Sequence, residues 1–231
     1  MTMKTIGILG GMSCESTALY YARLNAGTRA RLGGLHSADC LIRSLDFAEV
    51  EALQTAGDWD GAGAMLADAA KALEAGGAEL LILATNTMHK VAGPIESAIS
   101  IPFVHIADAT AAALHAAGCK RPGLMATAYT MEQAFYLWRL RAAGLNPIVP
   151  GTADRAETHR IIYEELCRGD IHDASRTAYV AIAGRLRDAG ADGLILGCTE
   201  VGMLLSAANS PLPVFDTTLI HCDAALDAAM A

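Results

Sequence analysis

A thiol, a hydroxyl and a carboxylate follow one another directly after a short apolar run near the end of the chain. The run is GLILG (residues 193–197), and Cys198, Thr199 and Glu200 come immediately after it. A thiol can act as an acid, a base or a nucleophile once it is ionised. The segment therefore predicts a rigid strand that presents Cys198 to a reactive site.

Ionisation of the Cys198 thiol needs help, because the ordinary pKa of a cysteine is about 8.5. A helix is predicted to begin at Glu200, and the amides of a helix N-terminus can lower the pKa of a nearby thiol. We therefore expect this helix to stabilise the Cys198 thiolate. The alternative is that Cys198 is a small buried apolar residue, as most free cysteines are. The other cysteines lack such a setting and are expected to be structural: Cys14, Cys40, Cys119, Cys167 and Cys222.

The segment around Cys198 has a counterpart earlier in the chain. Residues 71–87 (KALEAGGAELLILATNT) and 184–200 (GRLRDAGADGLILGCTE) share a helix end, an Ala-Gly turn, a strand with Leu-Ile-Leu and then polar groups. The alignment places Thr85 opposite Cys198, Asn86 opposite Thr199 and Thr87 opposite Glu200. Two further pairs follow the same order, IPFVHIAD (101–108) with LPVFDTT (212–218) and KTIGILGG (4–11) with RPGLMATA (121–128). The sequence therefore predicts two related halves, near residues 1–100 and 120–210.

Short apolar runs alternate with longer helical patterns along the chain. The runs predict strands at 4–9, 39–45, 79–84, 102–106, 122–126, 146–149, 193–197 and 213–215. Helices are predicted at 14–31, 47–53, 58–76, 88–99, 107–118, 130–143, 152–168, 171–189, 200–207 and 218–230. Nearly continuous apolar strands between helices indicate parallel sheets covered on both faces, so the predicted fold class is α/β.

The repeat predicts where a ligand binds. In parallel α/β sheets, ligands bind beyond the carboxyl ends of the strands, where Thr85 and Cys198 lie. If the two halves face each other about a pseudo-twofold axis, these residues reach a shared cleft from opposite sides. That arrangement suits the removal of a proton from one face of a carbon and its return to the other.

The first predicted strand leads into GILGGMSCEST, which combines a double glycine with a capped helix start. Gly11 and Met12 lie in the turn, and Ser13 is placed to cap the helix. Exposed amides in this turn could hold a carboxylate or a phosphate, and a tight turn without a ligand is the alternative. The segment lacks the GxGxxG spacing, which argues against a dinucleotide-binding fold.

Composition and charge exclude several kinds of partner. The chain of 231 residues has a net charge of −8 and no run of Lys or Arg, so neither nucleic acid nor an anionic membrane is expected as its main partner. No apolar stretch approaches the roughly 18 residues of a membrane span, and the first apolar segment is too brief for a secretory signal. The six cysteines are scattered without metal-ligand spacing, which indicates reduced thiols and a cytoplasmic protein.

Several motifs together resemble those of the cofactor-independent aspartate/glutamate racemase superfamily, and its bacterial amino-acid racemase branch in particular. They run in order through nearly the whole chain: GGMSxEST, RLGGLHSA (31–38), TNTMHKVA (85–92), HIADAT (105–110), YTMEQ (129–133), ADRAE (153–157), IIYEELCRG (161–169), GCTE and VFDTT. As a set they are highly specific, although each motif alone is not.

The resemblance implies two α/β lobes with the active site between them. The first lobe would be residues 1–100, completed by 212–231, and the second would be residues 101–211. The resemblance also implies an isomerase that uses neither pyridoxal phosphate nor a metal, a small amino-acid substrate and a homodimer. Cys198 and Thr85 would be the catalytic pair. Substrate binding would involve Gly11, Met12, Asn86, Thr87, Thr127 and Thr199.

The chain departs from the family pattern in places that concern the substrate. The usual motif has cysteine at both strand ends, whereas this chain has Thr85 at the first. Typical aspartate racemases place an Arg after the second strand, where this chain reads SLDFAEVE (44–51), and a Lys where it has Cys167. Arg43 and Arg168 lie nearby in the sequence, but both are expected to be solvated surface charges. Strict specificity for aspartate is therefore not implied.

Three functions remain open at this point. The first is an amino-acid racemase in which Cys198 and Thr85 serve opposite faces of Cα. The second is a decarboxylase or isomerase of dicarboxylic acids on the same fold, which needs one cysteine only. The third is a non-catalytic binding protein, against which the retention of Cys198 together with TNT and GCTE argues.

Overall fold

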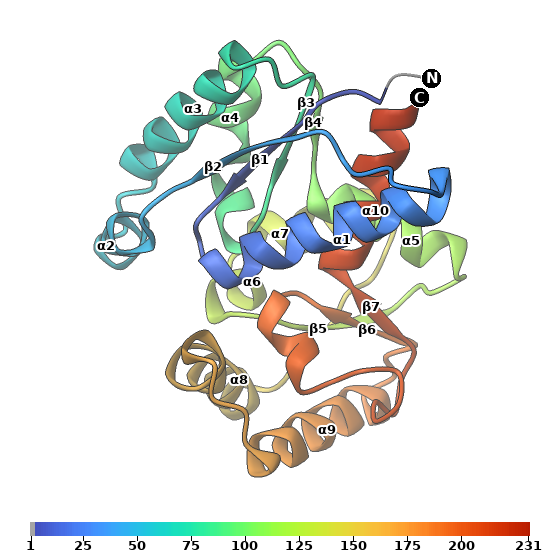
Figure 1. Cartoon of the computed structure of the whole chain (residues 1–231). Helices are drawn as coiled ribbons and strands as arrows, with labels where there is room; N and C mark the ends of the chain where they lie inside the picture. Colours follow the sequence, from blue (N-terminus) through green and yellow to red (C-terminus); the bar gives the residue numbers. More distant parts are fainter. Residues whose placement is uncertain (1–2) are drawn as a thin grey trace. The chain divides into compact units, whose positions relative to one another are not determined.

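The computed structural model describes residues 3–231 and divides the chain into two compact units. Unit 1 comprises the residues up to Ile106 together with His221–Ala231, and unit 2 comprises Ala107–Ile220. The first two residues of the predicted first lobe lie outside the described residues. Strands and helices alternate along the chain, which confirms the predicted α/β class (Figure 1).

Unit 1 is built on a parallel sheet with the strand order β2-β1-β3-β4. Its strands are β1 (Ile6–Gly10), β2 (Cys40–Ser44), β3 (Leu80–Leu83) and β4 (Phe103–Val104). Its helices are α1 (Cys14–Leu32), α2 (Phe47–Ala56), α3 (Trp59–Ala75), the 3-10 helix η1 (Thr87–Val91) and α4 (Ala92–Ala98). The last helix, α10 (Thr217–Met230), begins in unit 2 and joins unit 1 from His221 onward.

The central strands of unit 1 are covered on both faces, as their uninterrupted apolar sequences predict. Because successive side chains of a strand point to opposite faces, Ile8 and Ile82 pack in one cluster with α1 and α10. Leu81 and Leu83 lie in a second cluster with α3 and α4. The last helix of the chain is therefore part of the core of unit 1.

Unit 2 contains a parallel sheet with the strand order β5-β6-β7. The strands are β5 (Pro122–Met125), β6 (Gly193–Leu196) and β7 (Val214–Asp216). The helices are α5 (Ile106–Ala116), α6 (Ala128–Glu132), α7 (Ala134–Ala142), α8 (Thr152–Glu164), the 3-10 helix η2 (Leu166–Arg168), α9 (Asp173–Asp188) and the 3-10 helix η3 (Thr199–Met203).

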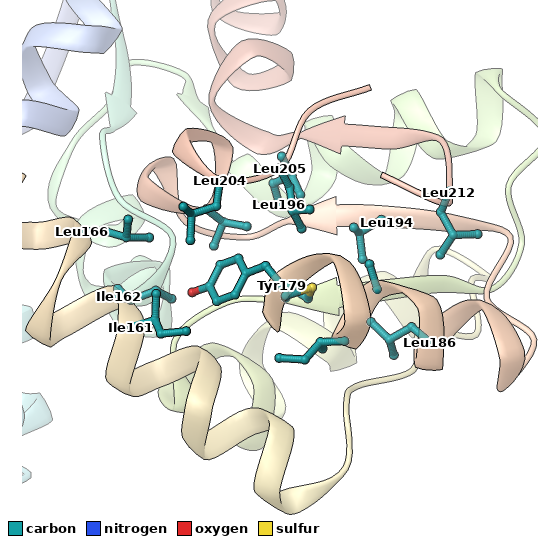
Figure 2. Packing of buried hydrophobic residues seen from close by; sticks show 14 of the residues in the cluster. Ile161, Ile162, Leu166, Tyr179, Leu186, Leu194, Leu196, Leu204, Leu205 and Leu212 are labelled. Atoms are coloured by element: carbon teal, nitrogen blue, oxygen red, sulfur yellow. The ribbon is translucent and has the colours of Figure 1, made fainter. Parts of the chain in front are cut away.

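The core of unit 2 is centred on the ring of Tyr179 from α9 (Figure 2). Side chains from α8, β6 and the segment after η3 surround this ring, among them Ile162, Leu196 and Leu204. The Tyr179 hydroxyl is satisfied, because it donates to the Thr158 carbonyl at 3.0 Å. One face of the second sheet is thus sealed by α8 and α9.

The two sheets have the same strand order, which confirms the predicted repeat. In unit 1, β1 lies between β2 and β3, and β4 pairs with β3. In unit 2, β5 lies between β6 and a parallel bridge at Ile148, and β7 pairs with β6. The bridge at Ile148 therefore corresponds to β2.

The register of the two sheets matches residue by residue. The Ala84 amide donates to the Leu9 carbonyl at 2.9 Å, and the Gly197 amide donates to the Met125 carbonyl at 2.8 Å. Leu81 bonds to Pro102 and Leu194 to Pro213 in the same way, each at 2.8 Å. Counting one residue on from Ala84 and Gly197 makes Thr85 equivalent to Cys198. The same register makes Gly11 equivalent to Thr127, whereas the predicted alignment of 4–11 with 121–128 is one residue out and sets Gly10 opposite Thr127.

Residues 212–231 are predicted to return to the first lobe, but the last strand does not. Instead β7 pairs with β6, and residues up to Ile220 belong to unit 2. The prediction is therefore wrong for this strand. The backbone groups of β7 find their partners on β6, whereas Cys222, Ala225 and Leu226 of α10 are buried against the first sheet.

Among the described residues, no helix is long and apolar enough to cross a membrane.

Candidate functional site

In unit 1, the predicted site residues meet at one edge of the sheet. In the sheet, β2 lies on one side of β1 and β3 on the other, so the direction in which successive strands are added reverses next to β1. Such a switch point, at the carboxyl ends of the strands, is where ligands bind in open α/β sheets. Gly11 and Met12 follow β1, and Thr85, Asn86 and Thr87 follow β3. The structure therefore brings these five predicted residues to the same edge.

The turn at Gly11 is held by the protein itself. Gly11 has a φ of +91°, and a Cβ at this position would lie 2.2 Å from the Leu45 carbonyl oxygen. Its amide donates to the Thr17 hydroxyl at 2.8 Å, and the Ser16 amide donates to Ser13 Oγ at 3.2 Å. Both amides therefore already have acceptors within the protein. The alternative, a tight turn into a capped helix, is what they form.

Thr85 is fixed through its backbone. Its carbonyl oxygen accepts a hydrogen bond from His89 Nδ1 at 2.7 Å, and His89 Nε2 accepts one from the Ile106 amide at 3.2 Å. The two bonds define a neutral His89 with its proton on Nδ1. Within residues 3–231, the Thr85 hydroxyl forms no hydrogen bond with another residue. His89 lies in the TNTMHKVA motif, but the sequence alone indicates no role for its side chain.

In unit 2, Cys198 lies at the equivalent strand end, where β6 leads into η3. Its side chain is partly buried and packs against the core cluster of this unit. The thiol donates a hydrogen bond to Glu200 Oε2 at 2.7 Å, and the Thr199 hydroxyl donates to the same oxygen at 2.6 Å. Glu200 is 6% exposed. The structure thus surrounds a buried carboxylate with two of the predicted site residues.

The thiol of Cys198 is less acidic than its position before a predicted helix indicates. Burial raises its pKa well above the ordinary value, and the carboxylate of Glu200 and the neighbouring Cys167 raise it further. The backbone amide of Glu200 does lower the pKa of Cys198, as expected of the first amides after the strand, but burial and the Glu200 carboxylate outweigh this effect. The segment after Cys198 is a five-residue 3-10 turn rather than a regular α-helix, so few peptide dipoles are aligned towards the sulfur. A negative charge lies within hydrogen-bond distance instead.

Thr127 lies just after the end of β5, beside the end of β6 in the parallel sheet. It caps α6, because its hydroxyl oxygen accepts from the Thr130 amide at 3.4 Å. The next amide, that of Ala128, donates to His159 Nδ1 at 3.3 Å. Burial lowers the pKa of His159, and its ring packs between those of Tyr129 and Tyr163. A largely uncharged aromatic cluster therefore borders Thr127.

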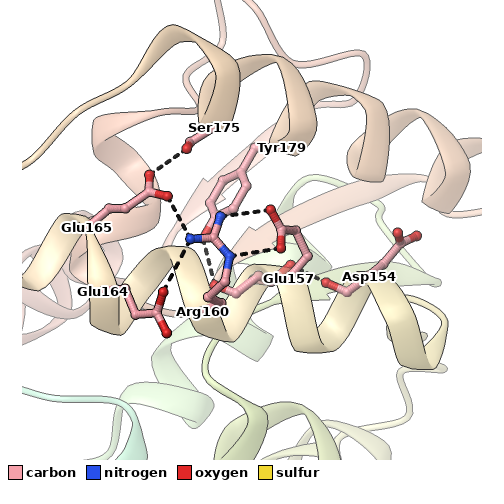
Figure 3. A network of polar contacts seen from close by, with 8 residues as sticks. Asp154, Glu157, Arg160, Glu164, Glu165, Ser175 and Tyr179 are labelled. Atoms are coloured by element: carbon pink, nitrogen blue, oxygen red, sulfur yellow. Dashed lines mark hydrogen bonds and ion pairs between the residues drawn. The ribbon is translucent and has the colours of Figure 1, made fainter.

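Three arginines in the two units are either exposed or already paired with carboxylates. Arg43 and Arg168 are exposed, as expected. Arg160 of α8 forms ion pairs with three carboxylates (Figure 3), those of Glu157 at 2.9 Å, Glu165 at 2.9 Å and Glu164 at 3.4 Å. Its charge is therefore already balanced within unit 2.

Comparisons with known proteins agree with the fold and with the motifs. The Asp/Glu/Hydantoin racemase family matches residues 9–225, so the chain belongs to this family. The protein is accordingly an isomerase of the amino-acid racemase type.

Solved structures resemble the chain over nearly its whole length. A Yersinia pestis protein assigned to the Asp/Glu racemases is 49% identical, with 99% of this chain and 100% of that chain covered and a TM-score of 0.94. An aspartate racemase homologue from Pyrococcus horikoshii is 34% identical, with 99% and 100% covered and a TM-score of 0.88. The aspartate racemase of Picrophilus torridus, at 21% identity, 98% and 94% coverage and a TM-score of 0.79, shows the fold alone.

Proposed function

We propose that the protein inverts Cα of an amino acid without a cofactor, with Cys198 on one face of Cα and Thr85 on the other. The observation that carries this proposal is the matching register of the two sheets, which makes Thr85 and Cys198 equivalent. A reaction that moves a proton between two faces of a carbon needs two such positions. Membership of the racemase family supports the same reaction.

In the proposed reaction, the Cys198 sulfur takes the Cα proton and the electron pair of the broken bond stays on the substrate. On the opposite face, the O–H bond of Thr85 or of a water beside it breaks with its electron pair left on oxygen, and that proton forms the new C–H bond. Met12, Asn86, Thr87, Thr127 and Thr199 would hold the α-carboxylate and the amino group, and Gly11 would form the turn that positions Met12. Amides and hydroxyls suit this task because they donate hydrogen bonds to a carboxylate without neutralising it.

Acidic amino acids are the first candidates for the substrate, because similar proteins are named after aspartate racemase. The side-chain carboxylate of such a substrate has no obvious arginine partner, since Arg43 and Arg168 are exposed and Arg160 is paired. We therefore propose a broad specificity. On the resemblance alone, we also propose a cytoplasmic homodimer, which light scattering would test.

The test is the wash-in of solvent deuterium at Cα, followed by NMR, for each pure enantiomer of a panel of amino acids. A threonine hydroxyl is not appreciably ionised at neutral pH and is a poor base. We therefore expect one enantiomer, the one whose Cα–H faces Cys198, to exchange much faster than the other. Cys198→Ala should reduce this exchange by on the order of 10²–10⁴-fold, as expected for a positioned acid/base.

Two controls make the deuterium experiment decisive. Thr85→Cys should bring the two wash-in rates closer together, to the extent that the new thiol ionises. The equilibrium constant of racemisation remains one, so the two enantiomers must have the same kcat/KM for inversion. The difference between their wash-in rates must therefore appear as exchange without inversion, or as different kcat values offset by different KM values. Equal wash-in for both enantiomers in the parent protein, or full activity in Cys198→Ala, would show that the pair is misassigned.

A second candidate is a one-cysteine decarboxylase or isomerase of dicarboxylic acids. It is favoured by the Thr85 hydroxyl, which forms no hydrogen bond with another described residue that could accept its proton. Such an enzyme needs a proton donor on one face only. Turnover of an arylmalonate or of maleate, with no deuterium exchange in any amino acid, would support this candidate over the racemase.

A further inference from the structure

The backbone around Thr85 is held at both of its peptide groups. The Thr85 amide donates to the Leu83 carbonyl at 2.8 Å, and the Ala84 carbonyl accepts from the Ser16 hydroxyl at 3.1 Å. These two bonds fix the peptide group before Thr85. The peptide group after it is held by His89, whose Nδ1 donates to the Thr85 carbonyl at 2.7 Å. The backbone dihedral angles on both sides of the Thr85 Cα are therefore constrained.

The bond from His89 takes the place of a backbone bond in the other half. In unit 2, the equivalent carbonyl, that of Cys198, accepts from the Val201 amide at 3.2 Å. Val201 lies three residues further on, so the backbone of η3 supports the strand end there. In unit 1, the Thr85 carbonyl accepts from a side chain instead. The direction of this carbonyl thus depends on one imidazole ring.

The ring of His89 is itself held on several sides. It is 3% exposed, and its Nε2 accepts from the Ile106 amide at 3.2 Å. The rings of His105 and Phe103 pack against it, with centroids 4.4 Å and 5.6 Å away. An imidazole that donates at one nitrogen and accepts at the other is fixed in tautomer and orientation. His89 is therefore a rigid link between the Thr85 carbonyl and the start of α5.

The backbone determines where the Thr85 hydroxyl points. Within residues 3–231, this hydroxyl forms no hydrogen bond with another residue that would orient it. Threonine is β-branched, so its χ1 angle has few allowed values once the backbone is set. A rotation of the peptide group after Thr85 would therefore move the hydroxyl as well. In a reaction at Cα, a misplacement of about 1 Å can cost on the order of 10²-fold in rate.

We propose that His89 is a positioning residue for the Thr85 face of the reaction. By holding the Thr85 carbonyl, it keeps the Thr85 hydroxyl directed at the face of Cα opposite to Cys198. His89 retains its own proton on Nδ1 and acts through Thr85 rather than on the substrate. The inference rests on the proposed function, because it requires a second face of Cα at which Thr85 acts.

Two substitutions of His89 separate its two hydrogen bonds. In His89→Asn, the amide nitrogen takes the place of Nδ1 and can still donate to Thr85, but the acceptor for Ile106 is lost. In His89→Gln, the longer side chain carries its oxygen to the place of Nε2 and can still accept from Ile106, but the donor to Thr85 is lost. Both variants lose the ring and one buried hydrogen bond, so we expect similar losses of stability.

The measurement is the ratio of inversion to exchange with retention in deuterated water. It uses the enantiomer whose Cα–H faces Cys198, and NMR with a chiral derivative separates the deuterated products. His89→Gln should lower the ratio by on the order of 10- to 10²-fold, because only inversion needs the Thr85 face, whereas His89→Asn should keep the parent ratio. A loss of folded protein reduces both products equally, so a merely structural role would leave the ratio unchanged.

His221→Gln is the matched control. His221 lies in the same cluster of buried rings, with its centroid 5.7 Å from that of His89. Its Nε2 donates to a different carbonyl, that of Val104, at 2.7 Å. Its substitution also removes a buried imidazole from unit 1 but leaves the bond to Thr85 in place, so the ratio should not change.

Each outcome decides whether His89 has this role. The parent ratio in His89→Gln, or equal losses in His89→Gln and His89→Asn, would overturn it and leave the racemase proposal intact. Nitrogen NMR of the parent protein should show the His89 proton on Nδ1. A proton on Nε2 instead would also overturn the role, even if neither variant folded. Absence of Cα exchange in the parent with every amino acid would reject the racemase, and the role of His89 in that reaction with it.

Discussion

The buried imidazole of His221 should make the stability of unit 1 depend on pH. The residue is 0% exposed, with Nε2 2.7 Å from the Val104 carbonyl oxygen and Nδ1 2.9 Å from the Tyr20 hydroxyl. A carbonyl can only accept, so Nε2 carries the proton and Nδ1 accepts from Tyr20. A second proton would reverse the bond to Tyr20 and charge a buried ring. Burial accordingly lowers the pKa of His221 from 6.5 to about 4.

The sign and size of the effect follow from these values. Because the folded pKa lies below the unfolded one, the unfolded chain binds more protons as the pH falls from about 6.5 to about 4. The stabilisation is therefore present above pH 6.5 and is lost progressively towards pH 4. At about 1.4 kcal/mol per pKa unit, the whole effect is about 3 kcal/mol. Integrated between pH 7 and pH 5, it is about 2 kcal/mol.

Urea unfolding can isolate this contribution in unit 1. The chain has two tryptophans, so Trp138→Phe leaves Trp59 of α3 as the only tryptophan reporter. In this background, His221→Gln keeps a donor for Val104 and an acceptor for Tyr20 but does not titrate. The stability lost between pH 7 and pH 5 should be smaller by about 2 kcal/mol in His221→Gln. His36→Gln, at an exposed histidine of the same unit, is the control. An equal pH dependence in the parent and in His221→Gln would refute the reasoning.

Two further predictions concern single contacts. Gly11→Ala should reduce both the free energy of unfolding and the activity, because the new Cβ would lie 2.2 Å from the Leu45 backbone. Gly77 has a φ of +102°, but a Cβ there would have no atom within 4 Å. Gly77→Ala should therefore reduce the free energy of unfolding only by the conformational strain of about 1–2 kcal/mol. Urea unfolding and deuterium wash-in measure the two effects, and equal losses in both variants would contradict the steric explanation. Tyr179→Phe should destabilise unit 2 by about 0.5–1.5 kcal/mol, because the hydrogen bond from the Tyr179 hydroxyl to the Thr158 carbonyl is lost. Unfolding followed by Trp138 in a Trp59→Phe background checks this, and an unchanged midpoint would contradict it.

The strands and their register were readable from the sequence because they depend on local patterns. Uninterrupted apolar runs such as LLIL and GLIL have few alternatives to a strand buried on both faces. The prolines at 102 and 213 occupy the same place in both sheets, since each carbonyl accepts from the neighbouring strand. The aligned motifs therefore carried the equivalence of Thr85 and Cys198.

The chemistry around Cys198 was not readable in the same way. The helix predicted from Glu200 is a short 3-10 turn, and Gly202 within it is a poor helix former. Sequence adjacency shows that Glu200 lies near Cys198, but it does not show that the carboxylate turns back towards the sulfur. The predicted placement of the last strand in the first lobe was wrong for a similar reason. Sequence alone does not show which sheet edge the strand pairs with, and the structure pairs it with β6.

The two halves use the same strand end for different purposes. In unit 1, the side chain four residues after Thr85 is His89, and it holds the Thr85 carbonyl. In unit 2, the equivalent position is Gly202, which has no side chain, and Glu200 instead contacts the thiol itself. The first half thus fixes a backbone carbonyl, whereas in the second half a carboxylate accepts a hydrogen bond from a side chain. Because Thr87 stands where the second half has Glu200, a thiol introduced at Thr85 would have different surroundings from Cys198. Thr85→Cys should therefore narrow the difference between the wash-in rates of the two enantiomers without abolishing it.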